Sequence, residues 1–247
     1  MSLSPASGTA RAVRRPRRPI RLVPQRDKRD ALLRAATAVF ARRGFFNAQV
    51  ADIARVAGVA AGTVYLYFRS KEDLLTSIFE RTMREAISEG RAALTGVRDP
   101  VARLREIARL HLDRLGRDRD LAIVFQVELR QSTKHMQHFS STLLQEYLAL
   151  IRDAIAEGQR LGSFRTDVHP TVAAKIFFGG LDEMATNWIL SRRRYALVTQ
   201  AEAVVDLFVN GVKGHERNRE RGSGIGVGDG GARAPASGPP RNVKRQA

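Results

Sequence analysis

A threonine, two tyrosines and a lysine lie close together in the stretch GTVYLYFRSKEDLL, residues 62–75. Thr63, Tyr65 and Tyr67 occupy every second position, and Lys71 follows four residues later. Hydroxyl and ammonium groups donate hydrogen bonds to phosphate oxygens, which is how proteins position themselves on a nucleic-acid backbone. Lys71 also lies beside the start of a predicted helix, where free backbone N–H groups favour an anion. The stretch is therefore suited to phosphate binding.

The elements that would position these groups have the proportions of a helix-turn-helix. Helices predicted over residues 48–57 and 61–67 flank a short turn at 58–60 that contains glycine. Such a unit presents its second helix to the major groove of DNA. The small residues at 60–62 would let the backbone of that helix approach DNA closely. A packed corner of two helices, with half-buried tyrosines and a solvated Lys71, has the same outline, so the pattern by itself leaves both interpretations open.

Apolar residues recur with helical spacing from Asp27 to Gly211, and no sustained strand alternation is present. The chain is therefore predicted to be all-α, with about nine helices. Ser70 to Asp73 has the spacing of a capping box, and Asp99-Pro100 joins an N-cap to a proline at the first helical position. The first expected helix ends at Gly44. The other expected helices cover residues 48–57, 61–67, 70–93, 100–115, 119–131, 134–161, 170–190 and 199–211.

The charge of the 247-residue chain, formally +17, is concentrated near its two ends. Residues 1–26 hold seven arginines and no acid, while residues 213–247 hold eight lysines and arginines against three acids. Both segments are poor in large apolar side chains, so we expect disordered basic arms. Such arms raise the affinity for any polyanion through counterion release. A solubilising role without a partner fits the composition equally well.

Several function classes are excluded or disfavoured by composition. The absence of cysteine excludes disulfide frameworks and thiolate metal sites. His135 and His138 are spaced as a possible metal pair, but no third ligand accompanies them, so neither a metal nor a cofactor is expected. An all-α body without a readable Ser/His/Asp arrangement argues against an enzyme. No run approaches the roughly 18 apolar residues of a membrane span, and no secretory apolar stretch is present, so the expected location is the cytoplasm.

The segment from about residue 27 to residue 75 resembles the N-terminal domain of the TetR family of transcriptional repressors. The resemblance implies that Tyr65, Tyr67 and Lys71 contact the DNA backbone and that Thr63 reaches a phosphate or a base edge. It also implies that Phe68 packs inside, together with Val64 or Leu66. The residues that carry the resemblance are Phe40, Gly44, Phe45, Val50, Ile53, Ala54, Ala57-Gly58-Val59, Gly62-Thr63, Tyr65, Tyr67-Phe68 and Lys71.

The segment also departs from the family pattern. Many members have serine or threonine where this chain has Ala48 and Ala60, so side-chain capping is lost there, and Asn47 is the candidate replacement cap. With Ala60 and Ala61 facing outward, direct base readout is expected to be thin. Gln49, apolar contact with thymine methyls and DNA shape are then the candidate readers. The predicted DNA-binding residues are Gln49, Ala60, Ala61, Gly62, Thr63, Tyr65, Tyr67 and Lys71.

The resemblance implies a DNA-binding domain followed by a larger domain for an effector and for dimerisation. The predicted parts are a basic arm (1–26), a helix-turn-helix domain (27–74), an effector-binding and dimerisation domain (75–212) and a basic tail (213–247). A homodimer interface is expected on the last two helices, 171–189 and 201–212. Gly179-Gly180 would either kink the first of these helices or permit close packing, and close packing is the favoured interpretation.

Two stretches of the larger domain, LAIVFQVELRQS (121–132) and FFGGLDEMATNWIL (177–190), resemble the acyl-CoA-responsive TetR-type repressors of fatty-acid degradation genes, as does AGTVYLYF (61–68). The resemblance implies that a long-chain acyl-CoA binds this domain and releases DNA. The candidate ligand-binding residues are Gln126, Arg130, Phe177, Asp182, Asn187 and Trp188.

Other interpretations of these residues remain open from the sequence. Arg130 could pair with Glu128 or with a neighbouring helix, and Gln126 could satisfy a buried carbonyl. The three candidates Asp182, Asn187 and Trp188 could face the dimer seam instead of a pocket. A repressor that answers to a hydrophobic cation, and a lipophile carrier that no longer binds DNA, are the alternative functions.

Overall fold

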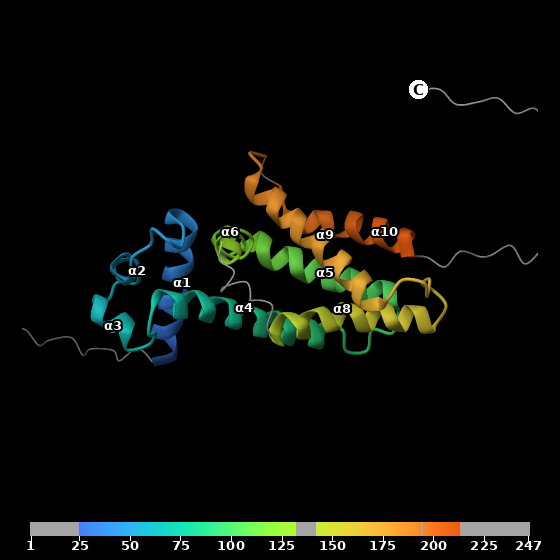
Figure 1. The fold of residues 1–247 in the computed structure, drawn as a ribbon, viewed down its shortest axis with the longest axis horizontal. Helices are drawn as coiled ribbons and strands as arrows, with labels where there is room; N and C mark the ends of the chain where they lie inside the picture. Colours follow the sequence, from blue (N-terminus) through green and yellow to red (C-terminus); the bar gives the residue numbers. More distant parts are fainter. Residues whose placement is uncertain (1–24, 132–141, 194, 213–247) are drawn as a thin grey trace, which may run out of the picture. The chain divides into compact units, whose positions relative to one another are not determined.

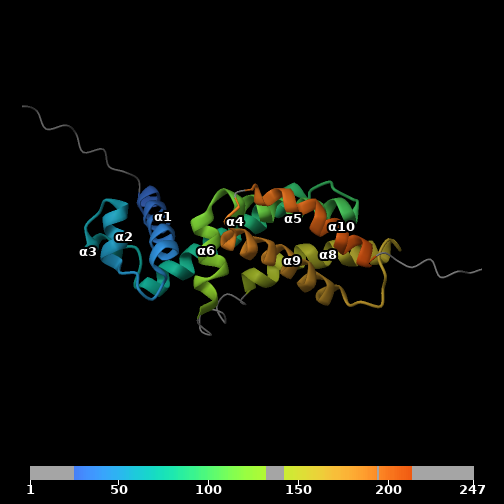
Figure 2. The same ribbon diagram turned by 90° about the horizontal axis from the view of Figure 1, so that it is seen from above.

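The computed structural model describes residues 25–131, 142–193 and 195–212, and over these residues it holds nine α-helices and no strand (Figures 1 and 2). The all-α prediction is thereby confirmed. The basic tail, nearly all of the basic arm, the His135/His138 pair and the first part of the helix expected over 134–161 lie outside these residues. The α-helices are α1 (Gln25–Arg43), α2 (Val50–Ala57), α3 (Ala61–Tyr65), α4 (Lys71–Ala93), α5 (Pro100–Arg117), α6 (Arg119–Gln126), α8 (Thr142–Arg160), α9 (Pro170–Leu190) and α10 (Ala201–Val212); the 3-10 turns are η1 (Glu128–Gln131) and η2 (Leu197–Gln200).

Helices α1 and α2 both end where glycine allows a left-handed backbone. Gly44 has φ of 75° and Gly58 has φ of 69°, a region that residues with a Cβ avoid. The expected cap by Asn47 is wrong. Its amide donates to the carbonyl of Arg43 at 3.3 Å, and α2 is preceded by Gln49, which makes no side-chain cap hydrogen bond. Helix α2 therefore begins without a side-chain cap.

The interior of the helix-turn-helix unit distinguishes between two residues that the sequence left as alternatives. Val64 and Phe68 are buried, whereas Leu66 is 79% exposed. Helix α3 ends at Tyr65, two residues earlier than expected, and the backbone continues through Tyr67 as a turn. This turn brings Phe68 into the core while Tyr65 stays at the surface.

Helix α4 begins where its capping residues predict, and it continues into the larger domain. The Ser70 hydroxyl accepts a hydrogen bond from the Asp73 N–H at 3.1 Å, and the Asp73 carboxylate accepts one from the Arg69 N–H at 2.8 Å. Helix α4 then runs unbroken to Ala93. The predicted boundary between residues 74 and 75 therefore falls inside one continuous helix. The helix-turn-helix domain and the larger domain share this rigid element.

The single helix expected over residues 119–131 is divided in the structure. Helix α6 ends at Gln126, Val127 leaves the regular helix, and η1 begins at Glu128. Residues 124–126 are buried, and so are Glu128 and Leu129. Because consecutive residues on a helix point about 100° apart, one straight helix would direct some of these side chains to solvent. The break therefore lets both groups of residues face the interior.

Helix α5 packs against α4, α8, α9 and α10, and α8 packs along α9 (Figures 1 and 2). Helix α9 runs without a break from Pro170 to Leu190, and a Cβ on Gly180 would lie 3.7 Å from Val204 of α10. A Cβ at this distance would be in ordinary van der Waals contact, so the role of Gly180 in close packing stays a prediction. Over the described ranges, the structure contains no helix with both the length and the apolar character that a membrane span requires.

Candidate DNA-binding face and effector cavity

The predicted DNA-binding residues gather around a shallow depression beside α2 and α3. Gln49, Ala61, Tyr65 and Lys71 line this depression together. Tyr65 is 58% exposed, so its hydroxyl is free to meet an external acceptor. The other four residues belong to the same short segment; Ala60 and Gly62 are exposed, and Thr63 and Tyr67 are half-buried.

Lys71 does more in the structure than its sequence position indicates. Its ammonium donates to the carbonyls of Phe46 and Ala48, both at 3.1 Å, and lies 4.6 Å from the centre of the Phe45 ring. The lysine therefore braces the turn between α1 and α2. An ammonium has three N–H donors, so two bonds to carbonyls leave one donor for a phosphate.

Sequence reasoning did not select three further residues on or near this face. Arg69 is exposed and lines the same depression. Phe46 and Leu66 are large apolar side chains that are mostly exposed. The signal for Arg69 was its place between Tyr67 and Lys71, whereas only the folded structure separates exposed Phe46 from buried Phe45.

A cavity lies between α4, α5, α6, α8 and α9 of the larger region. Its wall is mainly apolar and includes Met83, Ala86, Leu110 and Phe178. The space inside has a volume of about 50 Å³, and one buried water needs roughly 10–15 Å³ by a comparable measure. A long flexible chain can therefore enter only if side chains of the wall move apart.

His111 and Tyr147 form a buried polar pair in the wall of the cavity. His111 Nδ1 lies 3.0 Å from the Tyr147 hydroxyl, and both rings contact Phe178. Burial lowers the pKa of His111 to about 4; the charge of Asp182 opposes this change and that of Arg114 adds to it. Burial also raises the pKa of Tyr147. Both groups are therefore neutral at pH 7, as a lining for an apolar ligand requires.

Three residues form one hydrogen-bonded cluster around the Asp182 carboxylate. They come from α6, η1 and α9. The Gln126 amide donates to Asp182 at 2.7 Å, and Arg130 forms an ion pair with the other carboxylate oxygen. Thr186 donates to the Gln126 carbonyl at 3.1 Å. Gln126 and Asp182 line the cavity. Arg130 therefore pairs with a neighbouring helix, which was one of the two alternatives left open by the sequence.

The other three predicted ligand residues are not among the described residues of the cavity wall. The Phe177 ring packs on Phe208 with ring centres 4.8 Å apart. The Asn187 amide donates to the exposed Glu183, and the Trp188 indole donates to the Tyr195 carbonyl. The reason is helical geometry: residues four apart share a face. Phe178, which the sequence interpretation missed, therefore shares the cavity face with Asp182, whereas its neighbour Phe177 points about 100° away.

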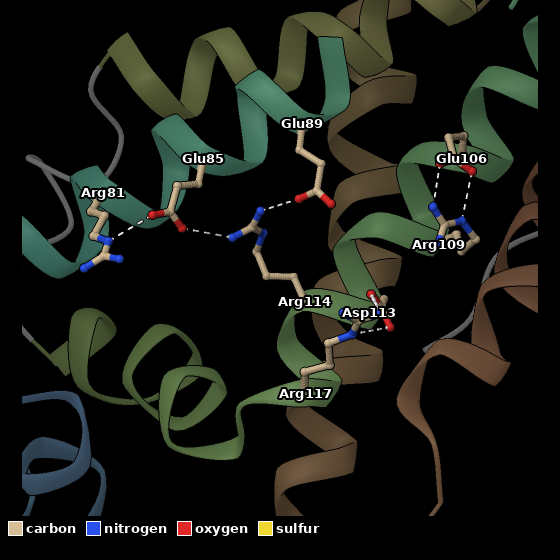
Figure 3. A network of polar contacts seen from close by, with 8 residues as sticks. All are labelled: Arg81, Glu85, Glu89, Glu106, Arg109, Asp113, Arg114 and Arg117. Atoms are coloured by element: carbon tan, nitrogen blue, oxygen red, sulfur yellow. Dashed lines mark hydrogen bonds and ion pairs between the residues drawn. The ribbon is translucent and has the colours of Figure 1, made fainter. Parts of the chain in front are cut away.

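A network of charged side chains runs along the exposed edge of α4 and α5 (Figure 3). Arg114 pairs with both Glu85 and Glu89, and Glu85 also pairs with Arg81. Arg81 reaches Asp30 of α1 at 2.9 Å. Since Glu89 and Arg114 line the cavity, the network joins the cavity rim to α1. Helix α5 carries two further local pairs in the same view, Glu106–Arg109 and Asp113–Arg117.

Two models of known families match consecutive parts of the chain. The model described as bacterial regulatory proteins, tetR family, matches residues 32–78, which contain α2, α3 and most of α1. The model described as YsiA-like protein, C-terminal region, matches residues 79–211, more than half of the chain. The chain belongs to the TetR family. It is therefore a bacterial-type transcriptional regulator, and its helix-turn-helix is the family's DNA-binding element.

Named relatives of this TetR-family regulator act in fatty-acid metabolism. The Fatty acid metabolism regulator protein of Bacillus subtilis (strain 168) is 34% identical over 188 residues, which cover 76% of this chain and 97% of the relative. The fatty acid degradation regulator FadR from Bacillus halodurans superposes with a TM-score of 0.71 at 36% identity, covering 74% of this chain and 95% of that chain. FadR from Bacillus subtilis in complex with stearoyl-CoA superposes with a TM-score of 0.70 at 34% identity, covering 74% of this chain and 98% of that chain.

Proposed function

We propose that this TetR-family regulator is a cytoplasmic repressor of fatty-acid degradation genes that a long-chain acyl-CoA releases from its operator. The observation that carries the proposal is an apolar cavity enclosed by five helices in a fold that superposes on a FadR–stearoyl-CoA complex. Burial of each methylene contributes about 0.8 kcal/mol, so a chain of about sixteen carbons supplies on the order of 10 kcal/mol before entropy losses.

The charges around the cavity support an anionic ligand over a cationic one. Both carboxylates in the described wall are already paired with an arginine, Glu89 with Arg114 and Asp182 with Arg130. A cation would therefore meet little uncompensated negative charge. Guanidinium groups bind phosphates with two parallel hydrogen bonds, so Arg114 and Arg130 are the groups that we assign to the phosphates of the CoA moiety.

The DNA-binding role of individual residues follows from their position on the helix-turn-helix. Exposed hydroxyls and the third N–H of Lys71 are suited to phosphate oxygens, and the small side chains of α3 let its backbone enter the groove. The residues that we assign to DNA are Gln49, Ala60, Ala61, Gly62, Thr63, Tyr65, Tyr67 and Lys71.

A homodimer through α9 and α10 would place two such units on one operator. Val172 and Ile176 of α9 and Leu207 of α10 are more than half exposed, which is unusual for side chains of this size. A Cβ on Gly179 would meet no atom within 4 Å, so this part of α9 is open to a partner helix. Two α3 helices about 34–36 Å apart would match successive major grooves. Sedimentation of Ile176→Glu tests this: a variant that remains a dimer would contradict the assignment.

The proposed function is tested with labelled DNA from the gene's own upstream region. We expect salt-sensitive, sequence-preferring binding that micromolar stearoyl-CoA abolishes and that CoA alone leaves intact. A lipophilic quaternary ammonium ion is the matched probe for the alternative effector class. DNA affinity that stearoyl-CoA does not change would rule out acyl-CoA, and the absence of any sequence preference would favour a carrier protein.

A further inference from the structure

Glu128 is a buried carboxylate from the effector side of the molecule that holds the turn leading into the DNA-binding helices. It lies in η1, directly after α6, and is 4% exposed. Its Oε2 accepts a hydrogen bond from the backbone N–H of Phe45 at 2.6 Å. A Cβ on Gly44 would lie 3.7 Å from the same oxygen, so the turn passes close to the carboxylate. This contact joins positions that are 83 residues apart in the sequence.

The turn held by Glu128 controls where α2 begins. The same turn is held from its other side by Lys71, whose ammonium binds the carbonyls of Phe46 and Ala48. Hydrogen bonds to a carboxylate are stronger than those to a neutral acceptor, so the loss of this one costs more than the loss of a neutral hydrogen bond. A movement of Glu128 therefore changes the position of the turn, and with it the start of α2.

The segment around Glu128 is tied to the effector cavity by its two neighbours. Gln126 and Arg130, two residues before and two residues after Glu128, both bind the carboxylate of Asp182 on α9. Gln126 and Asp182 line the cavity. The segment 126–130 thus contacts the cavity wall at its two ends and the DNA-binding turn at its centre.

We infer that Glu128 is the positioning residue through which occupancy of the cavity alters the DNA-binding face, and that Asp182 is the group on which the effector acts. The cavity is too small for a long chain as it stands, so binding moves wall residues, and a ligand shifts a conformational equilibrium only through interactions that differ between its states. The contacts of Asp182 with Gln126 and Arg130 supply that difference. The inference rests on the proposed function only for the identity of the effector.

The charged network on α4 and α5 is the competing connection between the two regions. Its link from Asp30 to Arg81 is about one-third exposed on each side. Exposed ion pairs contribute little and are screened by salt, whereas the bond from Phe45 to Glu128 is buried. We therefore assign the larger share of the coupling to Glu128.

The first experiment uses the full-length Glu128→Ala and Glu128→Gln variants, with stearoyl-CoA as the effector. The measured quantities are the effector affinity of the DNA-free protein and the ratio of operator Kd values with and without effector. We expect the effector affinity to stay within about twofold and the ratio to fall about tenfold in Glu128→Ala. Glu128→Gln keeps an acceptor oxygen, so its ratio should be intermediate. A purely structural role would change both operator Kd values equally, and an unchanged ratio would overturn the inference.

The second experiment needs no effector and separates a failure of the inference from a failure of the proposed function. Hydrogen exchange is measured on the peptide that contains Phe45, in Asp182→Asn and in the control Glu183→Gln. Glu183 is the exposed neighbour of Asp182 on α9. We expect exchange of the Phe45 amide to be about tenfold faster in Asp182→Asn and unchanged in the control. Equal exchange in wild type and Asp182→Asn would remove Asp182 from the connection, whichever effector the wild type answers to.

Discussion

The DNA-binding face and the effector cavity both use tyrosine, glutamine and charged side chains. These groups differ in their hydrogen-bond partners: solvent for the exposed tyrosine on the face, and other side chains of the protein in the cavity. On the face, Tyr65 is exposed, so its hydroxyl is open to water and to the phosphate that we propose it binds. In the cavity, Tyr147 is paired with His111, and Gln126 is paired with Asp182. A buried polar group without a partner costs free energy. A site for DNA can therefore keep its donors free, whereas the apolar site pairs most of its polar groups internally; among the described residues, the buried Nε2 of His111 has no hydrogen-bond partner.

This difference also explains why the cavity, rather than the face, can act as a sensor. A ligand that enters the cavity has to disturb bonds that already exist, and those bonds continue to the DNA-binding turn through Glu128. A phosphate that arrives at the face adds bonds to groups that were solvated. Substitutions in the cavity should therefore change the response to the effector, while substitutions on the face should change operator affinity and leave the response to the effector intact.

The largest effect is expected from blocking the cavity with Ala86→Phe. Ala86 lines the cavity, and an added ring would exclude about five methylenes, which at about 0.8 kcal/mol each weakens stearoyl-CoA binding roughly a thousandfold. Operator affinity without effector should change less than about twofold. Calorimetric titration checks the first value and gel shift the second. Ala92→Phe, at an exposed position of the same helix, is the control, and equal binding by both variants would place the acyl chain elsewhere.

The second prediction concerns stability in acid. Because His111 is buried in the cavity wall, it should lower the stability of the folded protein as the pH falls. The pKa of this group is about 4 in the folded protein and about 6.5 in an unfolded chain. Between these values the unfolded state binds a proton that the folded state does not, so stability is lost as pH falls from about 6.5 to about 4, by about 3 kcal/mol at most. The groups that modify this pKa most are Asp182 of α9 and Arg114 of α5.

Urea denaturation at several pH values measures this loss in the wild type and in His111→Phe. The variant should lose less stability over the same pH interval because it has no imidazole to protonate. His169→Asn replaces a histidine at the start of α9 that is outside the described cavity wall, so it serves as the control for the loss of a histidine. Identical slopes in all three proteins would contradict the assignment to His111.

The third prediction compares one substitution, glycine to alanine, in the two regions. In Gly158→Ala the new Cβ would lie 2.2 Å from the Phe164 ring, and such overpacking destabilises a core by about 1–3 kcal/mol. In Gly62→Ala the Cβ would meet no atom within 4 Å, and helix propensity favours alanine by up to about 1 kcal/mol. Gly62→Ala should instead weaken operator binding. A Gly62→Ala protein with full operator affinity would show that α3 does not approach DNA closely there.

The smallest effect, about tenfold in operator affinity, is expected from Tyr65→Ala. Because phosphate contacts position rather than specify, all operator variants should weaken alike, and the free energy of unfolding should not change since Tyr65 is exposed. Lys71→Ala should lose both affinity and stability, because its ammonium also binds two carbonyls of the turn. Binding to a panel of operator variants and urea denaturation distinguish the two. A loss confined to one operator variant would make Tyr65 a base-reading residue.

Local sequence rules were sufficient for most helix ends. The bounds expected for α9, residues 170–190, agree with the structure, and the N-cap expected at Asp99 is observed, with its carboxylate accepting from the Ala102 N–H at 2.7 Å. These bonds join residues within one turn of the chain, so the sequence contains all the participants. The expectation for residues 119–131 was too long because burial on two sides, which is not a local property, divided the segment.

The two sites differ in the same way. The sequence by itself determined that most of the residues predicted to bind DNA lie together, because all of them except Gln49 fall within residues 60–71. Only the tertiary structure decided the cavity: that Phe178 rather than Phe177 lines it, that Gln126 meets Asp182 across 56 residues, and that Glu128 reaches Phe45 across 83. The physical reason is that helical periodicity sets which residues share a face, whereas the neighbour that each face meets depends on how all the helices pack together.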